Sequence, residues 1–314
     1  MQAAEFEAFG PWIDRVRTLD EVPRLYRDAG IVPGAYRTVL KVPRNIDRRD
    51  AVPGMHLYDH LIAVDWENLT VLQRRGDRYA HFVVPLDRVG VLESSVNLLD
   101  GRLRIGTVDG GSIAVGYNAA DDTPVRELIA LLRDLYAPAD PEPVDSQTAG
   151  LAGLGRVPVD LGAEDIGLVT VYREVLAAEP GMALVNATLR RTVAGAGGGA
   201  GALGRAWQRW RPVTLHAGIV VADNREVQVI HRREWFTTGP AKVRSVARTV
   251  LPRGRISGLR VLRHGRFEQV NVLVVEAGLS SVAIPVPAGA DTEALVARLA
   301  TPALPGDWIS SARP

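Results

Sequence analysis

Two stretches of the chain repeat one order of elements, a series of short strands followed by a single helix. The first stretch runs from Leu61 to Tyr136, where short apolar runs separated by turn residues lead into an amphipathic helix that begins at Thr123. The same order returns from about Leu215 and ends in a helix that begins near Asp291. A period near ~150 residues is a domain duplication rather than a solenoid repeat. The pattern therefore predicts two similar units built mainly of antiparallel strands.

Short identities outside the strands support the duplication. Tyr26-Arg27-Asp28 corresponds to Tyr172-Arg173-Glu174, and Arg88-Val89 corresponds to Arg255-Ile256. Between the two units the chain is rich in proline and acidic residues, which is the composition of a linker. The predicted domains are N-terminal helices with the first unit over residues 1–140, a linker over 141–160, and a helix with the second unit over 161–314.

Local signals predict several boundaries. Gly30 is a C-cap that ends a short helix in the first 30 residues. Asp100-Gly101 between two apolar runs predicts the turn of a hairpin, and Asp121-Asp122-Thr123-Pro124 has the capping residues, acids and proline of a helix start. A helix is expected over Asp165–Ala178 and a strand over Ala183–Val193.

Charge is distributed unevenly along the chain. The net charge is +1, yet residues 181–270 contain 16 Lys and Arg against 4 Asp and Glu, while the remainder contains 21 against 32. Only Lys41 and Lys242 are lysines, so the cationic groups are almost all guanidinium groups. Arginine favours bidentate contacts with phosphate or carboxylate, which points to an anionic partner for the second unit.

The composition is that of an ordinary globular protein, with 46% hydrophobic and 23% charged residues. The chain lacks cysteine, an apolar run of membrane-spanning length and a basic, apolar N-terminal leader. We therefore expect a cytoplasmic protein, with peripheral attachment to a membrane as an alternative.

The strand series closed by one helix resembles the pleckstrin-homology superfold, in particular its bacterial PH-like and GRAM-like members. The resemblance rests on DHLIAVDWENLTVL, PLDRVGVLESS, DGRLRIGT and VGYNAADDTPVRELIALLR within residues 35–136, and covers residues 181–301 more loosely. It implies an α+β, mainly β fold: two PH-like, strongly bent antiparallel sheets, each closed by a C-terminal helix, with short helices preceding each. It also implies a binding or scaffolding role without shared catalytic residues.

Members of that superfold that bind anionic lipids use basic residues on the first strand and the following loop. The resemblance therefore directs attention to basic side chains at the matching places in both units. In the first unit these are Lys41, Arg44, Arg48 and Arg49, and in the second they are Arg190 and Arg191, with Arg209 and Arg211 beyond the loop.

The stretch AGAGGGAGALGRAWQRWRP over residues 194–212 is the most unusual in the chain. Its apolar side chains recur at helical spacing and arginines flank them. Such a segment could enter a lipid interface, dock on a protein, or pack its tryptophans into the core of its own unit. The candidate partner-binding residues here are Arg205, Trp207, Arg209, Trp210 and Arg211.

Patterns for catalysis, metals or cofactors are weak. Glycines at 199, 201 and 204 match a dinucleotide fingerprint in spacing, but the βαβ context that gives the motif its function is missing. His56 and His60 lie four apart at a junction of loop and strand, where they do not converge as they would on a helix. We expect no cofactor, no metal and no active site.

The predicted function is a non-enzymatic scaffold of tandem PH-like domains that engages a protein partner or an anionic surface through the Arg/Trp-rich face of its second domain. Three alternatives remain open. The first is a peripheral membrane protein that binds anionic phospholipid. The second is nucleic-acid binding through the same basic segment. The third is an enzyme, which would need a polar constellation in a pocket that the sequence does not show. Head-to-tail self-association through charge complementarity is a variant of the leading hypothesis.

Overall fold

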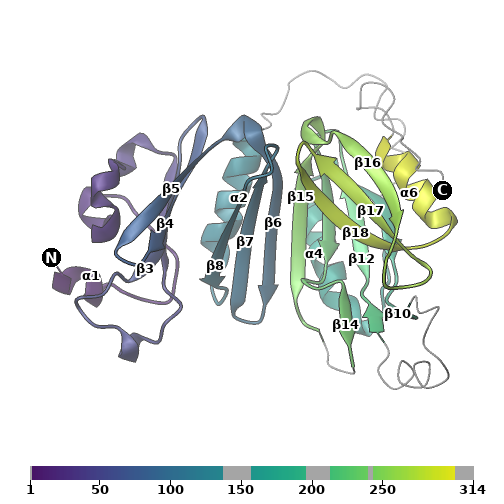
Figure 1. Cartoon of the computed structure of the whole chain (residues 1–314), viewed down its shortest axis with the longest axis horizontal. Coiled ribbons are helices and arrows are strands. Elements are labelled where there is room, and N and C mark those ends of the chain that lie inside the picture. Colours follow the sequence, from purple (N-terminus) through teal and green to yellow (C-terminus); the bar gives the residue numbers. More distant parts are fainter. Residues whose placement is uncertain (1, 137–156, 196–212, 240–242, 301–314) are drawn as a thin grey trace.

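The computed structural model describes residues 2–136, 157–195, 213–239 and 243–300 (Figure 1). We call residues 2–136 the first half and residues 157–300 the second half. The elements of the first half are α1 (Gln2–Glu7), β1 (Asp14–Arg15), η1 (Leu19–Glu21), η2 (Arg24–Ala29), η3 (Pro33–Ala35), β2 (Thr38–Pro43), η4 (Arg48–Asp50), β3 (Tyr58–Val64), β4 (Asn68–Arg75), β5 (Arg78–Pro85), η5 (Leu86–Arg88), β6 (Val89–Asn97), β7 (Asp100–Thr107), β8 (Ser112–Asn118) and α2 (Thr123–Tyr136).

The second half also consists of strands with a few helices. Its elements are η6 (Ala163–Asp165), α4 (Ile166–Ala178), β9 (Ala183–Thr188), β10 (Arg191–Val193), β11 (Val213–Leu215), β12 (Gly218–Ala222), β13 (Glu226–His231), β14 (Phe236–Thr238), β15 (Val246–Pro252), η7 (Arg253–Arg255), β16 (Gly258–Arg263), β17 (Val270–Ala277), β18 (Ser280–Pro287) and α6 (Ala290–Ala300). The described strand pairs are antiparallel, so the prediction of a mainly β fold with antiparallel sheets is confirmed.

Each half contains, among its other elements, the same series of four strands, a 3₁₀ turn, three strands and a helix, and in the second half β10, β11 and β14 interrupt this series. In the first half these are β2 to β5, η5, β6 to β8 and α2. In the second half they are β9, β12, β13 and β15, then η7, β16 to β18 and α6. The helices predicted from Thr123, near Asp291 and over Asp165–Ala178 are all present.

The two 3₁₀ turns have nearly the same backbone. Pro85 precedes η5 and Val89 follows it with φ −69° and ψ 115°, while Pro252 precedes η7 and Ile256 follows it with φ −70° and ψ 116°. The turn between β3 and β4 and the turn between β12 and β13 also have the same hydrogen bonds. Asp65 Oδ1 accepts from the backbone N–H of the residues two and three positions later, and Asp223 Oδ1 does the same. Such Asx turns fix the strand register that follows.

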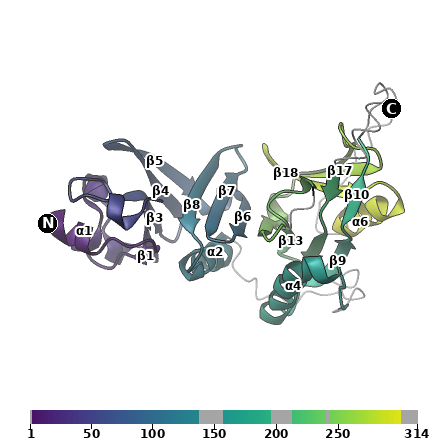
Figure 2. The same cartoon turned by 90° about the horizontal axis from the view of Figure 1, so that it is seen from below.

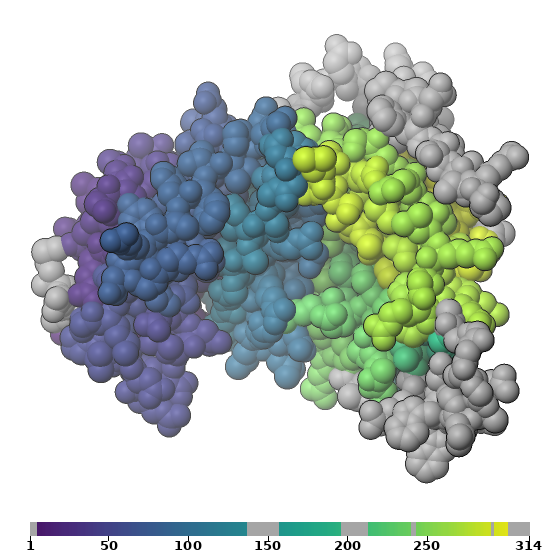
Figure 3. Space-filling model, viewed as in Figure 1, coloured from purple at the N-terminus to yellow at the C-terminus, as the bar shows by residue number. Residues whose placement is uncertain are grey.

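One sheet crosses from the first half into the second. Its seven strands have the order β8-β7-β6-β15-β13-β12-β9, and β6 pairs with β15 so that Leu92 lies opposite Val250 (Figure 1). The other sheets are β1-β2-β3-β4-β5, β10-β11-β14 and β16-β17-β18. The sequence did not indicate the joint between β6 and β15, which we call the seam. Along it the first-half and second-half surfaces are in direct contact (Figure 3).

The cores of the two halves interlock at the seam. Val91 of β6 belongs to the core under β16 to β18 and α6, whereas Val250 of β15 belongs to the core under α2. Both side chains are at most 1% exposed. Helices α2 and α4 lie on the same side of the seven-stranded sheet (Figure 2), where α4 covers β12 and β13. A third layer of residues, from the N-terminal segment around Phe9 and Tyr26, covers the outer face of β2 to β4.

Three local predictions need correction. The helix that ends at Gly30 is the 3₁₀ helix η2, although Gly30 does adopt the left-handed conformation, with φ 74°. The strand predicted over Ala183–Val193 is two strands, because β9 pairs with β12 and β10 pairs with β11 in another sheet. The hairpin between β6 and β7 turns at Leu98-Leu99, since Asn97 lies opposite Asp100 and Leu98 carries the positive φ of 56°.

Gly101 is required for packing rather than for the turn. A Cβ atom at Gly101 would overlap the ring of Tyr117, which lies opposite it on β8 and is 8% exposed. Gly101, which suggested a turn, is therefore needed because the Tyr117 ring packs directly against its Cα.

We expect Gly101→Ala to lower the free energy of unfolding by about 1–3 kcal/mol, the usual cost of overpacking a close contact. The matched control is Gly116→Ala on the neighbouring strand, where an added Cβ meets nothing within 4 Å. Urea denaturation measures both, and equal effects for the two variants would contradict the packing role of Gly101.

Candidate binding site and the polar network at the seam

A cavity of about 520 Å³ opens at one end of the second half. Its walls come from β11, from β14 and the loop that follows, and from the connection between β16 and β17. The residues lining it are Val213, Phe236, Thr237, Thr238, Val243, His264, Arg266 and Phe267.

Three rings form the apolar part of the cavity wall. The ring centroids of Phe236 and Phe267 are 4.7 Å apart, and the imidazole of His264 lies 5.0 Å from Phe236 and 4.9 Å from Phe267. Burial and the nearby Arg266 guanidinium lower the pKa of His264. Its Nδ1 accepts from the backbone N–H of Arg266, so the neutral ring carries its proton on Nε2. The cavity therefore offers an aromatic wall that includes a neutral imidazole.

Four arginines at this end of the second half are exposed and form no ion pair with the residues that the structure describes. Arg266 lines the cavity with its guanidinium 5.8 Å from the Phe267 ring centre, and Arg244 and Arg263 each adjoin a lining residue in sequence. Arg191 lies on β10, whose Val193 is opposite the lining residue Val213. These positive charges are available to a partner that enters the cavity.

The described residues on both sides of segment 196–212 lie at the same cavity. Gly195 forms an isolated β-bridge with Phe267, and the backbone N–H of Glu268 donates to the carbonyl of Ala194 over 3.0 Å. Val213, which follows the segment, lines the cavity. The predicted site residues Arg205, Trp207, Arg209, Trp210 and Arg211 lie outside the described residues, so their role remains a prediction.

Arg190 and Arg191, the two other predicted site residues of the second half, differ in whether they form an ion pair. Arg190 forms an ion pair with Glu164, which precedes α4. Arg191 is exposed and unpaired among the described residues. Arg191 is therefore the one whose charge is available, on a strand that pairs with the β11 part of the cavity wall.

In the first half the predicted basic residues make contacts within the chain. Lys41 is 8% exposed, and its ammonium lies 5.1 Å from the centre of the Tyr58 ring. Arg44 donates to the carbonyl of His56, and Arg49 pairs with Asp47. Arg48 donates to carbonyls of Phe6, Glu7 and Phe9, which satisfies carbonyl groups at the end of α1. The structure does not gather these four side chains around a cavity.

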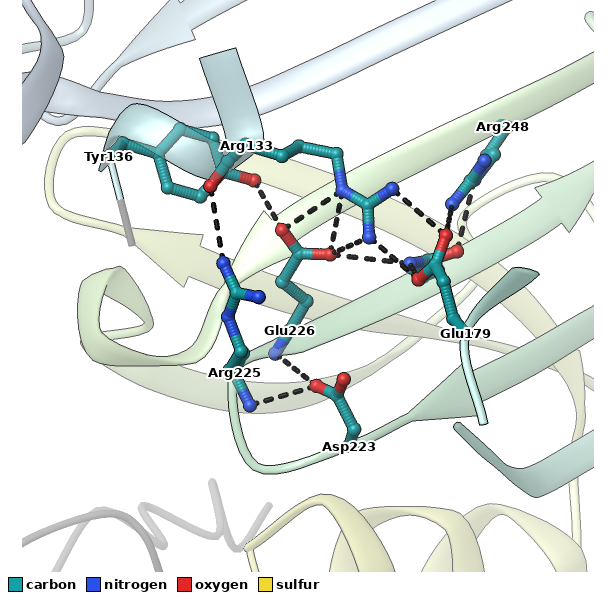
Figure 4. A network of polar contacts seen from close by, with 8 residues as sticks. Arg133, Tyr136, Glu179, Asp223, Arg225, Glu226 and Arg248 are labelled. Carbon is teal, nitrogen blue, oxygen red and sulfur yellow. Dashed lines mark hydrogen bonds and ion pairs between the residues drawn. The ribbon is translucent and has the colours of Figure 1, made fainter. Parts of the chain in front are cut away.

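A polar network of charged groups lies beside the seam (Figure 4). Arg133 near the end of α2 donates to both carboxylate oxygens of Glu226 on β13, at 2.6–3.1 Å, and to Glu179 after α4. Arg248 on β15 also donates to Glu179, over 2.5 Å. Tyr136 donates its hydroxyl proton to Glu226 over 2.7 Å, and the Gln228 amide bridges both carboxylates. Two charges of each sign therefore neutralise one another between the two halves.

Burial and the neighbouring charged groups act on the pKa values of several residues in this network. Burial raises the pKa of the Glu179 carboxyl, but the guanidinium groups of Arg133 and Arg248 hold it below its usual value. Burial raises the pKa of Tyr136, and the adjacent Glu226 carboxylate raises it further. Burial lowers the pKa of Arg248, with Glu179 acting against it. The groups are held in one charge state near neutral pH, which fits a structural joint better than proton transfer.

A second joint lies at the other end of the seam. Arg233 pairs with Asp100 and also donates to Ser95 Oγ and to the Ser95 carbonyl, so one guanidinium fastens the β6–β7 hairpin to the second half. Arg232 is 3% exposed and pairs with the buried Asp165 before α4. Much of the arginine excess of residues 181–270 is therefore used inside the molecule.

The described residues contain no group of three His, Asp or Glu side chains that could hold a metal ion. No helix among them is long and apolar enough to cross a membrane. His231 stacks on Trp235 with centroids 4.6 Å apart, donates or accepts at both ring nitrogens, and has its pKa lowered to about 4 by burial. It is a satisfied core histidine at neutral pH.

The aromatic wall was missed by reasoning from the sequence. Phe236 lies on the short strand β14, whereas His264 and Phe267 lie in the connection between β16 and β17, and neither place shows a periodic pattern in the sequence. The predicted series of antiparallel strands did contain a signal for the aromatic wall. Phe236 comes soon after one strand of the second unit, and His264 and Phe267 come soon after another strand that runs in the same direction, so the three rings would be expected at the same end of the unit.

No protein-family model matches the chain, and no curated protein matches it.

We expect Arg133→Met to destabilise the protein by about 3–5 kcal/mol, because it leaves the buried Glu226 carboxylate without its counter-charge. The control is Arg126→Met on the same helix, whose pair with Asp122 is exposed and is worth less than about 1 kcal/mol. Urea denaturation at neutral pH measures both. A cost for Arg133→Met no greater than that of the control would show that the network does not hold the halves together.

Acid should weaken the fold through Glu179. Since its folded pKa lies below the unfolded value of 4.5, its stabilising effect is complete above that value and is lost as the pH falls through the folded pKa. Urea titrations at about pH 7 and about pH 3 should show a smaller acid loss in Glu179→Gln than in the wild type. Glu174→Gln on the exposed face of α4 is the control, and an acid loss in Glu179→Gln equal to that in the control contradicts this role.

Proposed function

We propose that the chain is a non-enzymatic binding protein of two pleckstrin-homology-like units, and that its second unit engages a protein partner or an anionic surface at the arginine-rimmed cavity. The order of four strands, a turn, three strands and a closing helix in each half supports the PH-like assignment. The observation that carries the binding proposal is the aromatic wall beside four exposed arginines that lack acidic partners among the described residues.

The chemistry of the cavity favours an anionic group with an apolar neighbour. Guanidinium groups recognise carboxylate or phosphate, while aromatic rings provide the anchoring surface typical of interfaces. The Thr237 and Thr238 positions add polar groups to the same wall. An acidic protein segment meets both requirements, and an anionic lipid surface meets the charge requirement.

The first test is co-sedimentation with phosphatidylcholine vesicles, with or without phosphatidylserine, beside binding to an immobilised acidic peptide library. Two arginine variants are compared with the wild type. The first combines Arg263→Ala and Arg266→Ala. The second combines Arg205→Ala, Arg209→Ala and Arg211→Ala. We expect each variant to lose about tenfold or more in affinity for the anionic target, as loss of a charge-assisted contact predicts.

The control replaces Arg17 and Arg173, which are exposed and distant in sequence from the cavity walls. It should bind as the wild type does. Binding should also weaken between about 50 mM and about 200 mM salt if charge drives it. Wild-type binding that is insensitive to salt and unchanged in both arginine variants would refute the proposal, as would failure of the wild type to bind any anionic target.

A further inference from the structure

Strands β5 and β16 are unpaired edges. Each is the outermost strand of its sheet, and no backbone hydrogen bond to another described residue leaves its outer side. Both edges expose large apolar side chains: Phe82 (36%) and Val83 (53%) on β5, and Val261 (38%) and Leu262 (42%) on β16. Exposed edges of this kind accept a further strand.

The β5 edge is the first-half equivalent of β15. Asn68, the first residue of β4, lies opposite Pro85, and Glu226, the first residue of β13, lies opposite Pro252. The same Asx turn precedes both pairs, and the same 3₁₀ turn follows both prolines. Counting back from the prolines, Val83 of β5 occupies the place that Val250 has in β15.

The β16 edge is in turn the second-half equivalent of β6. Both strands begin after the 3₁₀ turn, with Val89 and Ile256 in the same conformation. Leu92 lies opposite Ile105, and Leu259 lies opposite Val275, with all four side chains in the cores. Leu259 therefore occupies the place of Leu92.

Within the chain these two kinds of edge are already joined, since the seam pairs β6 with β15. We propose that a second copy of this chain docks head to tail, with β16 of one molecule pairing antiparallel with β5 of the next. The register of the seam, Val250 opposite Leu92 and Ala247 opposite Ser95, then places Val83 opposite Leu259 and Ala80 opposite Leu262. One joint is observed within the chain, and the other repeats it between chains.

Side-chain burial gives the joint its driving force. Val250 is 1% exposed because it enters the first-half core under α2. Its equivalent Val83 is 53% exposed in the single chain and would enter the second-half core of the neighbour. The backbone groups of both edges would gain ladder partners at the same time.

The joint between chains lacks the polar network that accompanies the seam. The equivalents of Glu226 and Arg248 are Asn68 and His81, so the strong ion pairs are not reproduced. Association therefore depends on backbone pairing and apolar contact, and it should vary with protein concentration rather than be permanent. A head-to-tail contact is heterologous, and it produces open chains or closed rings instead of a simple symmetric dimer.

Sedimentation velocity over a range of concentrations tests the assembly. The mean mass of the wild type should rise from the monomer value of 33.9 kDa through at least its double. Val83→Arg blocks the β5 edge, and Val261→Arg with Leu262→Arg blocks the β16 edge. Each variant alone should stay at the monomer mass, and an equimolar mixture should form a heterodimer and nothing larger, since one intact edge of each kind remains.

Cysteine cross-linking tests the register without relying on disruptive variants. The chain has no cysteine, so Ala80→Cys with Leu262→Cys in one chain can form only new disulfides. Directly opposite strand positions have the Cα separation that a disulfide needs. Oxidation should give a ladder of covalent multimers, while Ala80→Cys with Arg17→Cys, which places the second thiol off the β16 edge, should not.

Several results would overturn the proposal. These are a wild type that remains a monomer at every concentration, a mixture of the two blocked variants that does not pair, or a β16-blocked variant that dimerises alone. The Arg205→Ala, Arg209→Ala, Arg211→Ala variant, which leaves β5 and β16 unchanged in sequence, should assemble as the wild type does, so that failure of ligand binding at the cavity and failure of assembly are told apart.

Discussion

The pairing of β6 with β15 is the contact on which the architecture depends. It makes one sheet of strands from two halves and places Val91 and Val250 each in the core of the other half. Neither half therefore completes its core from its own residues. The two halves, which share a series of elements, form one body through this contact.

The arginines serve two purposes in this body. Those near the seam, Arg133, Arg233 and Arg248, are bound by carboxylates and lock the halves at both ends of the joint. Those around the cavity, such as Arg263 and Arg266, remain exposed. The basic character of the second half is therefore partly a consequence of internal counter-ions, and only the remainder describes a surface that can attract an anion.

The sequence predicted the elements better than their connections. Helix starts such as Asp121 to Pro124 and the alternation within strands are local signals, and they placed α2, α4 and most strands correctly. The seam was not predictable, because alternation fixes which face of β6 is buried but not which strand lies beside it. The cavity was not predictable either, because its rings come from the short strand β14 and from the connection between β16 and β17. Gly101 was interpreted as a turn residue, whereas it makes room for Tyr117.

The seam has a consequence for how the chain is made. Residues 92 and 250 are separated by most of the polypeptide, so β6 leaves the ribosome long before its partner strand exists. During that interval the nascent first half has an uncovered strand edge and a core that lacks Val250. The growing chain must tolerate this exposed edge until the second half has been synthesised, and the order of synthesis thus sets when the edge is covered.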